Sequence, residues 1–352
     1  NILPAFRVSF IKLNADISTG FRLICLVISL LVGLQIQAVS YHFQHISSRQ
    51  GLPHQQVEAM IQDGKGNIWF GTRNGLARYD GYTMHSYFHE SGKDHSLAHH
   101  FIKALFLDHS NRIWICNPKG VSRYRPATDD FVNYDVPGTT VQSILETSKG
   151  KIICAGNELC VFDEKTQSFV ALPSLGEGFI ISIAIDRHDR LFVATNTSIY
   201  SYNSSLTKIT RLDPKYYRDF ITGADGIIPM MFDHLGRLWI GKNGNGVMSI
   251  DLKTGNSIVY QPGVLSNGTV RTIKEDRQHR ILLGTEKGVT IIHPSGRIEI
   301  LQQFLGNINT LSDNAIYSIL IDKNDNIWIG SYFGGVDLLQ NDKYWRISHF
   351  GC

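Results

Sequence analysis

A short phrase that recurs seven times along the chain constrains the fold more than any other feature of the sequence. Each copy consists of a turn, usually led by an aspartate, followed by three apolar residues and a small residue. The copies lie at residues 63–71, 108–116, 147–155, 186–194, 233–241, 276–284 and 322–330. Measured between the central apolar residues, the gaps are 45, 39, 39, 47, 43 and 46 residues. A period in the low forties is typical of a β-propeller built from four-stranded blades.

The first copy predicts how one repeat forms one blade. Strands are expected at residues 57–62, 67–71, 76–80 and 84–88, joined by short hairpins. The second of these strands is apolar on successive residues rather than on alternate ones, so both of its faces should be buried between neighbouring blades. Burying each large side chain contributes about 2–3 kcal/mol. We therefore predict an all-β protein, a seven-bladed β-propeller of four-stranded antiparallel blades.

The fourth position of each phrase holds residue types that tolerate a left-handed backbone, as a type I turn followed by an αL residue requires. These residues are Gly66, Asn111, Gly150, Asp189, Gly236, His279 and Asp325. The leading aspartate suits the first position of the turn, because its side chain can accept a backbone N–H. Thr147 replaces it in the third copy. Turn formation thus explains six recurring aspartates without any chemistry.

Two spare strands flank the repeats, at residues 41–46 and 344–350, and only one of them can complete the seventh blade. The other strands of that blade are expected near residues 316–321, 326–330 and 336–340. We predict that the N-terminal segment closes the ring, because a blade built from both chain ends removes open edges. The propeller then spans residues 40–343. Residues 344–352 start a second propeller, or else form the last strand of blade seven.

Residues 1–39 have the composition of an export signal. Arg7, Lys12 and Arg22 precede an apolar stretch at residues 23–34, which as a helix would span about 18 Å, short of the ~30 Å hydrocarbon core of a membrane. A signal peptide cleaved near Ala38 is the favoured interpretation, and an uncleaved anchor is the alternative.

Charge and cysteine content exclude several function classes. The net charge is +3 with no run of either sign, so a nucleic-acid partner is not indicated. Cys116, Cys154 and Cys160 lack zinc-site spacing. Cys154 and Cys160 are close enough in sequence to form a disulfide across a strand connection, although buried thiols are the favoured reading.

Five histidines lie close together in the sequence, at positions 85, 89, 95, 99 and 100. On a strand the first two would be about 13 Å apart, and adjacent residues such as His99 and His100 tend to point in opposite directions. We therefore expect neither a metal site nor a cofactor.

The amino-acid sequence of the repeats resembles that of a known family. Residues 51–57, 68–72 and 75–82 of the first repeat, and 310–314 ahead of the seventh, resemble the two-component regulator propeller repeat. That repeat is found in the periplasmic sensor regions of hybrid two-component sensor histidine kinases, and the resemblance covers residues 40–350. It implies an export signal, two propellers, an immunoglobulin-like domain, a membrane helix, and kinase and response-regulator modules. This chain carries one propeller of that arrangement.

The resemblance also implies a function and partners. We expect the N-terminal propeller of an oligosaccharide-responsive sensor region in the periplasm, anchored in the inner membrane as part of a full-length homodimer. The second propeller and the downstream kinase modules would be its partners within the protein. This piece should be non-catalytic, with the histidine kinase activity lying downstream.

Residues that recur in every blade have a structural role in the propeller, so a unique binding site should lie where the repeats differ. The loops that enter the first strand of each blade and the loops between its second and third strands open on the same face. Their polar and aromatic residues are the predicted ligand-binding candidates: His54, Gln55, Arg73, Asn74, His99, His100, Lys119, Asn196, Lys242, Asn243, Asn245, Lys287, Asp313, Asn314, Tyr332 and Phe333. Such groups suit a sugar fragment through hydrogen bonds and ring stacking.

Two other functions fit the same fold. One is an enzyme such as a lyase of the streptogramin-cleaving type, and the other is a protein-interaction scaffold. An enzyme requires a tight cluster of titratable groups with perturbed protonation at the central opening, whereas a sensor needs only a polar groove. No catalytic residue is assigned from the sequence.

Overall fold

The computed structural model describes residues 41–138, 140–176, 178–217 and 228–341. The segments predicted as an export signal (1–39) and as the start of a further element (344–352) lie outside these residues. Among the described residues, no helix is long and apolar enough to cross a membrane. The described residues lie in one compact unit.

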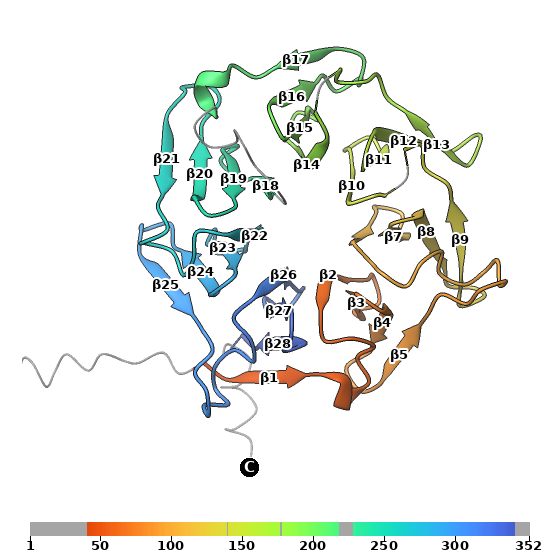
Figure 1. Cartoon of the computed structure of the whole chain (residues 1–352), viewed down its shortest axis with the longest axis vertical. Helices are drawn as coiled ribbons and strands as arrows, with labels where there is room; N and C mark the ends of the chain where they lie inside the picture. The colour runs from red at the N-terminus through yellow and green to blue at the C-terminus, as the bar shows by residue number, and fades with distance from the viewer. Residues whose placement is uncertain (1–40, 139, 177, 218–227, 342–352) are drawn as a thin grey trace, which may run out of the picture. The chain divides into compact units, whose positions relative to one another are not determined.

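Seven four-stranded antiparallel sheets stand around a central axis, as the sequence predicted (Figure 1). Blade 1 consists of β2 (Val57–Gln62), β3 (Ile68–Thr72), β4 (Gly75–Tyr79) and β5 (Met84–Tyr87). Blade 2 consists of β6 (Ala104–Leu107), β7 (Ile113–Asn117), β8 (Gly120–Arg125) and β9 (Asp130–Tyr134). Blade 3 consists of β10 (Ser143–Glu146), β11 (Ile152–Ala155), β12 (Leu159–Asp163) and β13 (Ser168–Ala171). Blade 4 consists of β14 (Ile180–Ile185), β15 (Leu191–Thr195), β16 (Ile199–Tyr202) and β17 (Ile209–Arg211). Blade 5 consists of β18 (Met230–Phe232), β19 (Leu238–Lys242), β20 (Gly246–Ile250) and β21 (Ser257–Tyr260). Blade 6 consists of β22 (Val270–Glu275), β23 (Ile281–Thr285), β24 (Gly288–Ile292) and β25 (Ile298–Leu301).

Blade 7 is built from both ends of the propeller. It consists of β26 (Ile316–Ile321), β27 (Ile327–Ser331), β28 (Val336–Leu339) and β1 (Phe43–Ile46). Strand β1 pairs antiparallel with β28, from Phe43 opposite Leu339 to Ile46 opposite Val336. The predicted closure by the N-terminal segment is therefore confirmed. Two short 3-10 helices, η1 (Ser48–Gln50) and η2 (Pro214–Tyr216), lie in the connections.

The second strand of each blade carries the core. Every residue of β3, β7, β11, β15, β23 and β27 is buried, as predicted for strands with both faces covered. Trp69 shows how blades join: it packs with Leu105 and Tyr124 of blade 2, and its ring lies 4.8 Å from that of Tyr124. Cys116, Cys154 and Cys160 are buried free thiols, so the favoured reading of the cysteines holds.

The turn in each repeat has the predicted conformation. All seven residues of the fourth position have positive φ, from 58° at Asn111 to 95° at Gly66. Asp63 accepts hydrogen bonds from the backbone amides of Lys65 and Asn67, each at 2.9 Å. Its second carboxylate oxygen accepts the indole N–H of Trp69 at 2.9 Å. The phrase is thus one unit in which the turn aspartate also orients the core tryptophan.

The first strand of each blade lies nearest the centre of the ring, as β2, β10, β14, β18, β22 and β26 show (Figure 1). The loops that enter these strands lie at one end of the ring axis, together with the turns between the second and third strands of each blade, such as the turn between β3 and β4. The aspartate turns lie at the other end, because each inner strand runs antiparallel to the strand that follows it.

Candidate functional site

The predicted loop face is a continuous surface made by neighbouring blades. The backbone N–H of Arg73 donates to the carbonyl of Gln56 at 3.1 Å within blade 1. The N–H of Gly75 donates to the carbonyl of His100 at 2.6 Å, which links blade 1 to the loop entering blade 2. A similar bond of 2.6 Å joins Gly288 to Asn314 between blades 6 and 7. These bonds fix the loops against each other.

Several predicted binding residues are used by the loops themselves. The ring nitrogen Nδ1 of His54 accepts the backbone N–H of Gln56 at 3.0 Å, and that of His99 accepts the N–H of Phe101 at 2.9 Å. Carboxylate and amide oxygens of Asp313, Asn314 and Asn196 likewise accept backbone N–H groups. The amide oxygen of Asn243 accepts the Thr269 hydroxyl. These side chains shape the face.

Other predicted residues lie exposed but spread over different blades. Gln55 and Asn74 are in blade 1, His100 and Lys119 in blade 2, Asn245 in blade 5 and Lys287 in blade 6, with Lys242 of blade 5 half-buried. The rings of His99 and His100 stack at 4.2 Å rather than pointing apart, because these residues lie in a loop and not in a strand. Tyr332 and Phe333 also contact each other, with ring centroids 4.4 Å apart.

A group of residues that the sequence analysis did not select joins Arg73 and Tyr332 into one cluster, here called the loop-side cluster. Its further members are Glu58, Phe101, Lys103, Arg271, Glu286 and Tyr317, from blades 1, 2, 6 and 7. Arg271 forms an ion pair with Glu286 and lies 4.8 Å above the ring of Tyr317. The ring of Tyr317 is 5.3 Å from that of Tyr332.

Two further cations complete the loop-side cluster around one aromatic ring. Lys103 Nζ lies 4.3 Å and the Arg73 guanidinium 4.8 Å from the ring centre of Phe101. Burial raises the pKa of Glu58, although Lys103, Arg73 and Arg271 act in the opposite direction. Burial likewise raises the pKa of the Tyr317 hydroxyl. The result is a mixed charged and aromatic surface that offers hydrogen-bond donors, two carboxylates and rings for stacking.

A sequence signal for this cluster exists. The signal is the residue that lies five positions before the leading residue of each turn, in the inner strand or just ahead of it. In chain order these residues are Glu58, Lys103, Gln142, Ile181, Ile228, Arg271 and Tyr317. Charged or aromatic residues occupy this position in four adjacent blades, 6, 7, 1 and 2, and uncharged, non-aromatic residues occupy it in the other three. Strand positions near the axis break the repeat there, whereas the candidates predicted from the sequence were loop residues.

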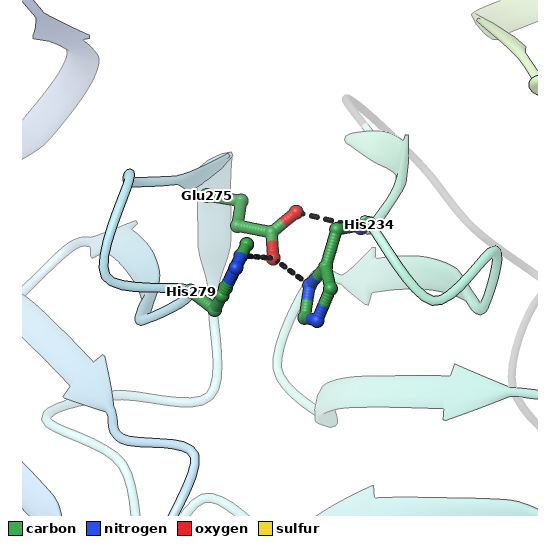
Figure 2. A group of neighbouring side chains, drawn as sticks. All are labelled: His234, Glu275 and His279. Carbon is green, nitrogen blue, oxygen red and sulfur yellow. Dashed lines mark hydrogen bonds and ion pairs between the residues drawn. The ribbon is translucent and has the colours of Figure 1, made fainter.

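A second group lies at the opposite end of the axis. His234 is in the aspartate turn of blade 5, Glu275 ends β22, and His279 is in the aspartate turn of blade 6 (Figure 2). One ligand atom from each lies within 4.8 Å of the others, close enough for the three to share a metal ion. None of the five histidines weighed from the sequence belongs to it. The three residues border a hollow of about 590 Å³.

Comparison with protein families identifies the repeats. A model described as "two component regulator propeller" matches residues 51–74 and 310–333. These two segments are two-component regulator propeller repeats. They include the first two strands of blades 1 and 7 with the aspartate turn between them, and these two blades lie on either side of the ring closure. A comparison with curated proteins gave no match.

Solved structures similar to this chain include sensor domains and other propellers that carry the same fold. The extracellular domain of a hybrid two-component system from B. thetaiotaomicron has a TM-score of 0.73 at 19% identity, covering 85% of this chain and 42% of the other. Virginiamycin B lyase from Staphylococcus aureus has a TM-score of 0.67 at 14% identity, covering 86% and 99%. PorZ, a surface component of the type-IX secretion system of Porphyromonas gingivalis, has a TM-score of 0.63 at 14% identity, covering 83% and 47%. The chain spans about two fifths of the B. thetaiotaomicron domain.

Proposed function

We propose that this propeller is part of an extracytoplasmic sensor region of a hybrid two-component sensor kinase, and that it binds an oligosaccharide without altering it. The repeats at both sides of the ring closure support the assignment to such sensors. The B. thetaiotaomicron structure with the same fold is an extracellular domain, which supports export to the periplasm. Anchoring in the inner membrane and kinase activity belong to the remainder of the full-length protein.

The loop-side cluster is the observation that carries the proposed ligand. Its aromatic rings, Phe101, Tyr317 and Tyr332, are the kind of surface on which sugar rings stack, and the cations are held beside them at 4.3–4.8 Å. Three cations face two carboxylates, so a glycan fragment with acidic groups suits the cluster better than a neutral one. Exposed Phe333 extends the stacking surface.

Signalling would follow from differential affinity. In a homodimeric receptor, a ligand that binds one arrangement of the sensor regions more tightly shifts the population toward that arrangement. Because the loop-side cluster draws on four blades fixed against each other by backbone hydrogen bonds, the ring would present the ligand as a rigid body. The second propeller and the kinase modules would then respond to that surface.

Calorimetric titration of the chain with acidic and neutral oligosaccharides tests the proposal. We expect saturable binding that R73A and R271A weaken by about tenfold each, since a charged hydrogen bond contributes about 1.5–3 kcal/mol. K149A is the matched control, because Lys149 is an exposed cation in a turn at the opposite end of the axis. An absence of binding to any member of the panel, or equal losses in K149A, would contradict the proposal.

The lyase fold of S. aureus supports one rival function, an enzyme on the same ring. An enzyme would convert the bound compound, whereas a sensor releases it unchanged. Mass spectrometry of each oligosaccharide after prolonged incubation separates the two. A new product that disappears in E58Q would favour the enzyme, because Glu58 is the acid with a raised pKa in the loop-side cluster.

A further inference from the structure

We propose that His234, Glu275 and His279 form a binding site for a divalent transition metal of the zinc class, bridging blades 5 and 6 at the end of the axis opposite the loop-side cluster. The inference is independent of the proposed sensor function. It rests on the geometry of the three side chains and on a comparison with another junction of the same ring.

The ligand atoms already converge. His279 Nδ1 lies 3.2 Å from Glu275 Oε1, and His234 Nδ1 contacts the same oxygen (Figure 2). In a tetrahedral zinc site the ligand atoms are about 3.3 Å apart, with metal–nitrogen distances of about 2.0–2.1 Å. The two imidazole rings stack at 3.6 Å with an interplanar angle of 23°. A cation placed between both nitrogens and the carboxylate would satisfy all three ligand atoms.

The carboxylate is oriented by the backbone. Glu275 Oε2 accepts the N–H of His234 at 2.8 Å, so Oε1 remains directed at the two imidazoles. Such outer contacts hold metal ligands in position and reduce the entropy lost on binding. All three residues lie next to or within the aspartate turns, whose conformation the repeat itself fixes. His279 has φ of 59°, the left-handed turn position.

The junction between blades 2 and 3 shows what the third ligand adds. There His109 and Glu146 occupy the positions that correspond to His234 and Glu275. The His109 N–H donates to Glu146 Oε2 at 2.9 Å, and His109 Nδ1 lies 2.6 Å from that same oxygen. The residue in the place of His279 is Gly150, also with positive φ. A histidine and a glutamate alone therefore tie neighbouring blades together. Of these two junctions, the one between blades 5 and 6 carries the second histidine, which completes a three-ligand set.

The surroundings are compatible with a bound cation. Glu275, Asp276 and Asp322 border the hollow, against Arg277 and Lys323. Both of these cations have partners: Arg277 lies 3.1 Å from Asp325, and Lys323 donates to the carbonyl of Asp63 at 3.0 Å. Two neutral imidazoles and one carboxylate are ligands that zinc accepts, with a fourth position left for water or a ligand group.

Zinc titration of the tag-free chain, followed by calorimetry and by thermal unfolding, tests the site. We expect one equivalent to bind and to raise the unfolding temperature. H279G should weaken binding by at least about tenfold while keeping the fold, because glycine suits the left-handed turn position. H109A is the matched control and should leave zinc affinity unchanged. No saturable binding by the wild type, or equal affinity in H279G, would overturn the proposal.

The reciprocal change provides an independent test. G150H places a histidine beside His109 and Glu146 in the same turn position that His279 occupies. The binding stoichiometry should rise from one zinc to two. A folded G150H chain, verified by circular dichroism, that still binds a single equivalent would show that the three-ligand arrangement does not account for the binding.

Discussion

At the scale of single residues, the turn aspartate is an integral part of the core. Asp63 is buried and receives hydrogen bonds from the side chains of Asn67 and Trp69 as well as from two backbone amides. Burial opposes ionisation, but these hydrogen bonds outweigh it and lower the pKa of Asp63. A carboxylate with a lowered folded-state pKa stabilises the fold above its ordinary value of 3.8, and that contribution is lost as the pH falls through the folded-state pKa.

The substitution D63A should lower the free energy of unfolding by about 3 kcal/mol at neutral pH, because it leaves the buried indole N–H of Trp69 without an acceptor. D63T should lower it less, by about 2 kcal/mol, since a hydroxyl can still close the turn. Thr147 does this in blade 3, accepting the N–H of Lys151 at 3.1 Å. Urea unfolding measures both. Equal losses in the two variants would show that the turn bonds contribute little.

Lys274 is a residue at which the ring departs from its own pattern. The position in question is two residues before the leading residue of each turn, in the inner strand, and it is apolar in the other six blades. In chain order it holds Ile61, Phe106, Leu145, Ala184, Met231, Lys274 and Leu320. The Lys274 side chain is exposed by its accessible surface, although the density of protein around it desolvates the ammonium group and lowers its pKa. A lysine with a lowered folded-state pKa destabilises the fold below that pKa, and the penalty disappears as the pH rises past the ordinary value near 10.5.

We therefore expect K274M to raise the unfolding temperature by about one degree at neutral pH, because solvent screens an exposed ammonium group, with a smaller gain in strongly alkaline buffer. K149M, at an exposed turn position, is the control and should change little. Scanning calorimetry at two pH values measures the difference. A lower unfolding temperature in K274M would show that the ammonium group makes a favourable contact in the ring.

At the scale of elements, the closing strand β1 is held by a buried charge. His45 Nδ1 lies 2.6 Å from Asp337 Oδ1 on β28, and Nε2 lies 2.8 Å from the carbonyl of Ile308. Both ring nitrogens face acceptors, so these contacts favour the doubly protonated, cationic imidazole. The hydrogen bond to Asp337 is the main cause that raises the pKa of His45, with desolvation acting against it.

This contact makes ring closure sensitive to pH. A histidine with a raised folded-state pKa contributes its full stability below the unfolded value of 6.5, and that contribution is lost as the pH rises through the folded-state pKa. Between about pH 6 and about pH 8.5, we expect the wild type to lose about 1–2 kcal/mol of unfolding free energy that H45Q does not lose. H42Q, at an exposed neighbour, should behave as wild type. Parallel pH dependence in H45Q and wild type would contradict the assignment.

The elements were largely predictable because the repeat enforces them. Strand β2 begins and ends at the predicted residues, and β1 was identified as the closing strand from its position before the first repeat. The candidate site was less predictable. Loop residues such as Arg73 and Tyr332 were selected from the sequence, but Arg271 and Glu58 are strand residues whose role depends on which blades are adjacent. The His234–Glu275–His279 group was missed because its members come from two repeats and look like turn residues.

At the scale of the whole molecule, the ring is a single cooperative structure only if blade 7 is complete. Inner strands of blades 7 and 1 also touch directly, since the Ser318 hydroxyl donates to the carbonyl of Val57 at 2.9 Å. Six of the inter-blade interfaces join blades that follow one another in the sequence. The seventh joins blade 7 to blade 1, whose residues are about 260 positions apart in sequence, as this bond shows. The closing strand thus decides whether the first and last blades remain together.

Deletion of residues 41–46 should open this junction. The edge of β28 would be exposed, and exposed strand edges promote association between molecules. We expect urea unfolding to change from one transition to several, with a smaller dependence on urea concentration because less surface is buried in each unit. Light scattering should detect association. A synthetic peptide of residues 41–47, added in excess, should restore the single transition by supplying β1 in trans. The same peptide with proline at both positions 44 and 45 should not, because successive N–H groups of an edge strand alternate and one of the two must face β28. A deletion variant that unfolds in one transition with unchanged urea dependence would show that the other six interfaces suffice to hold the ring.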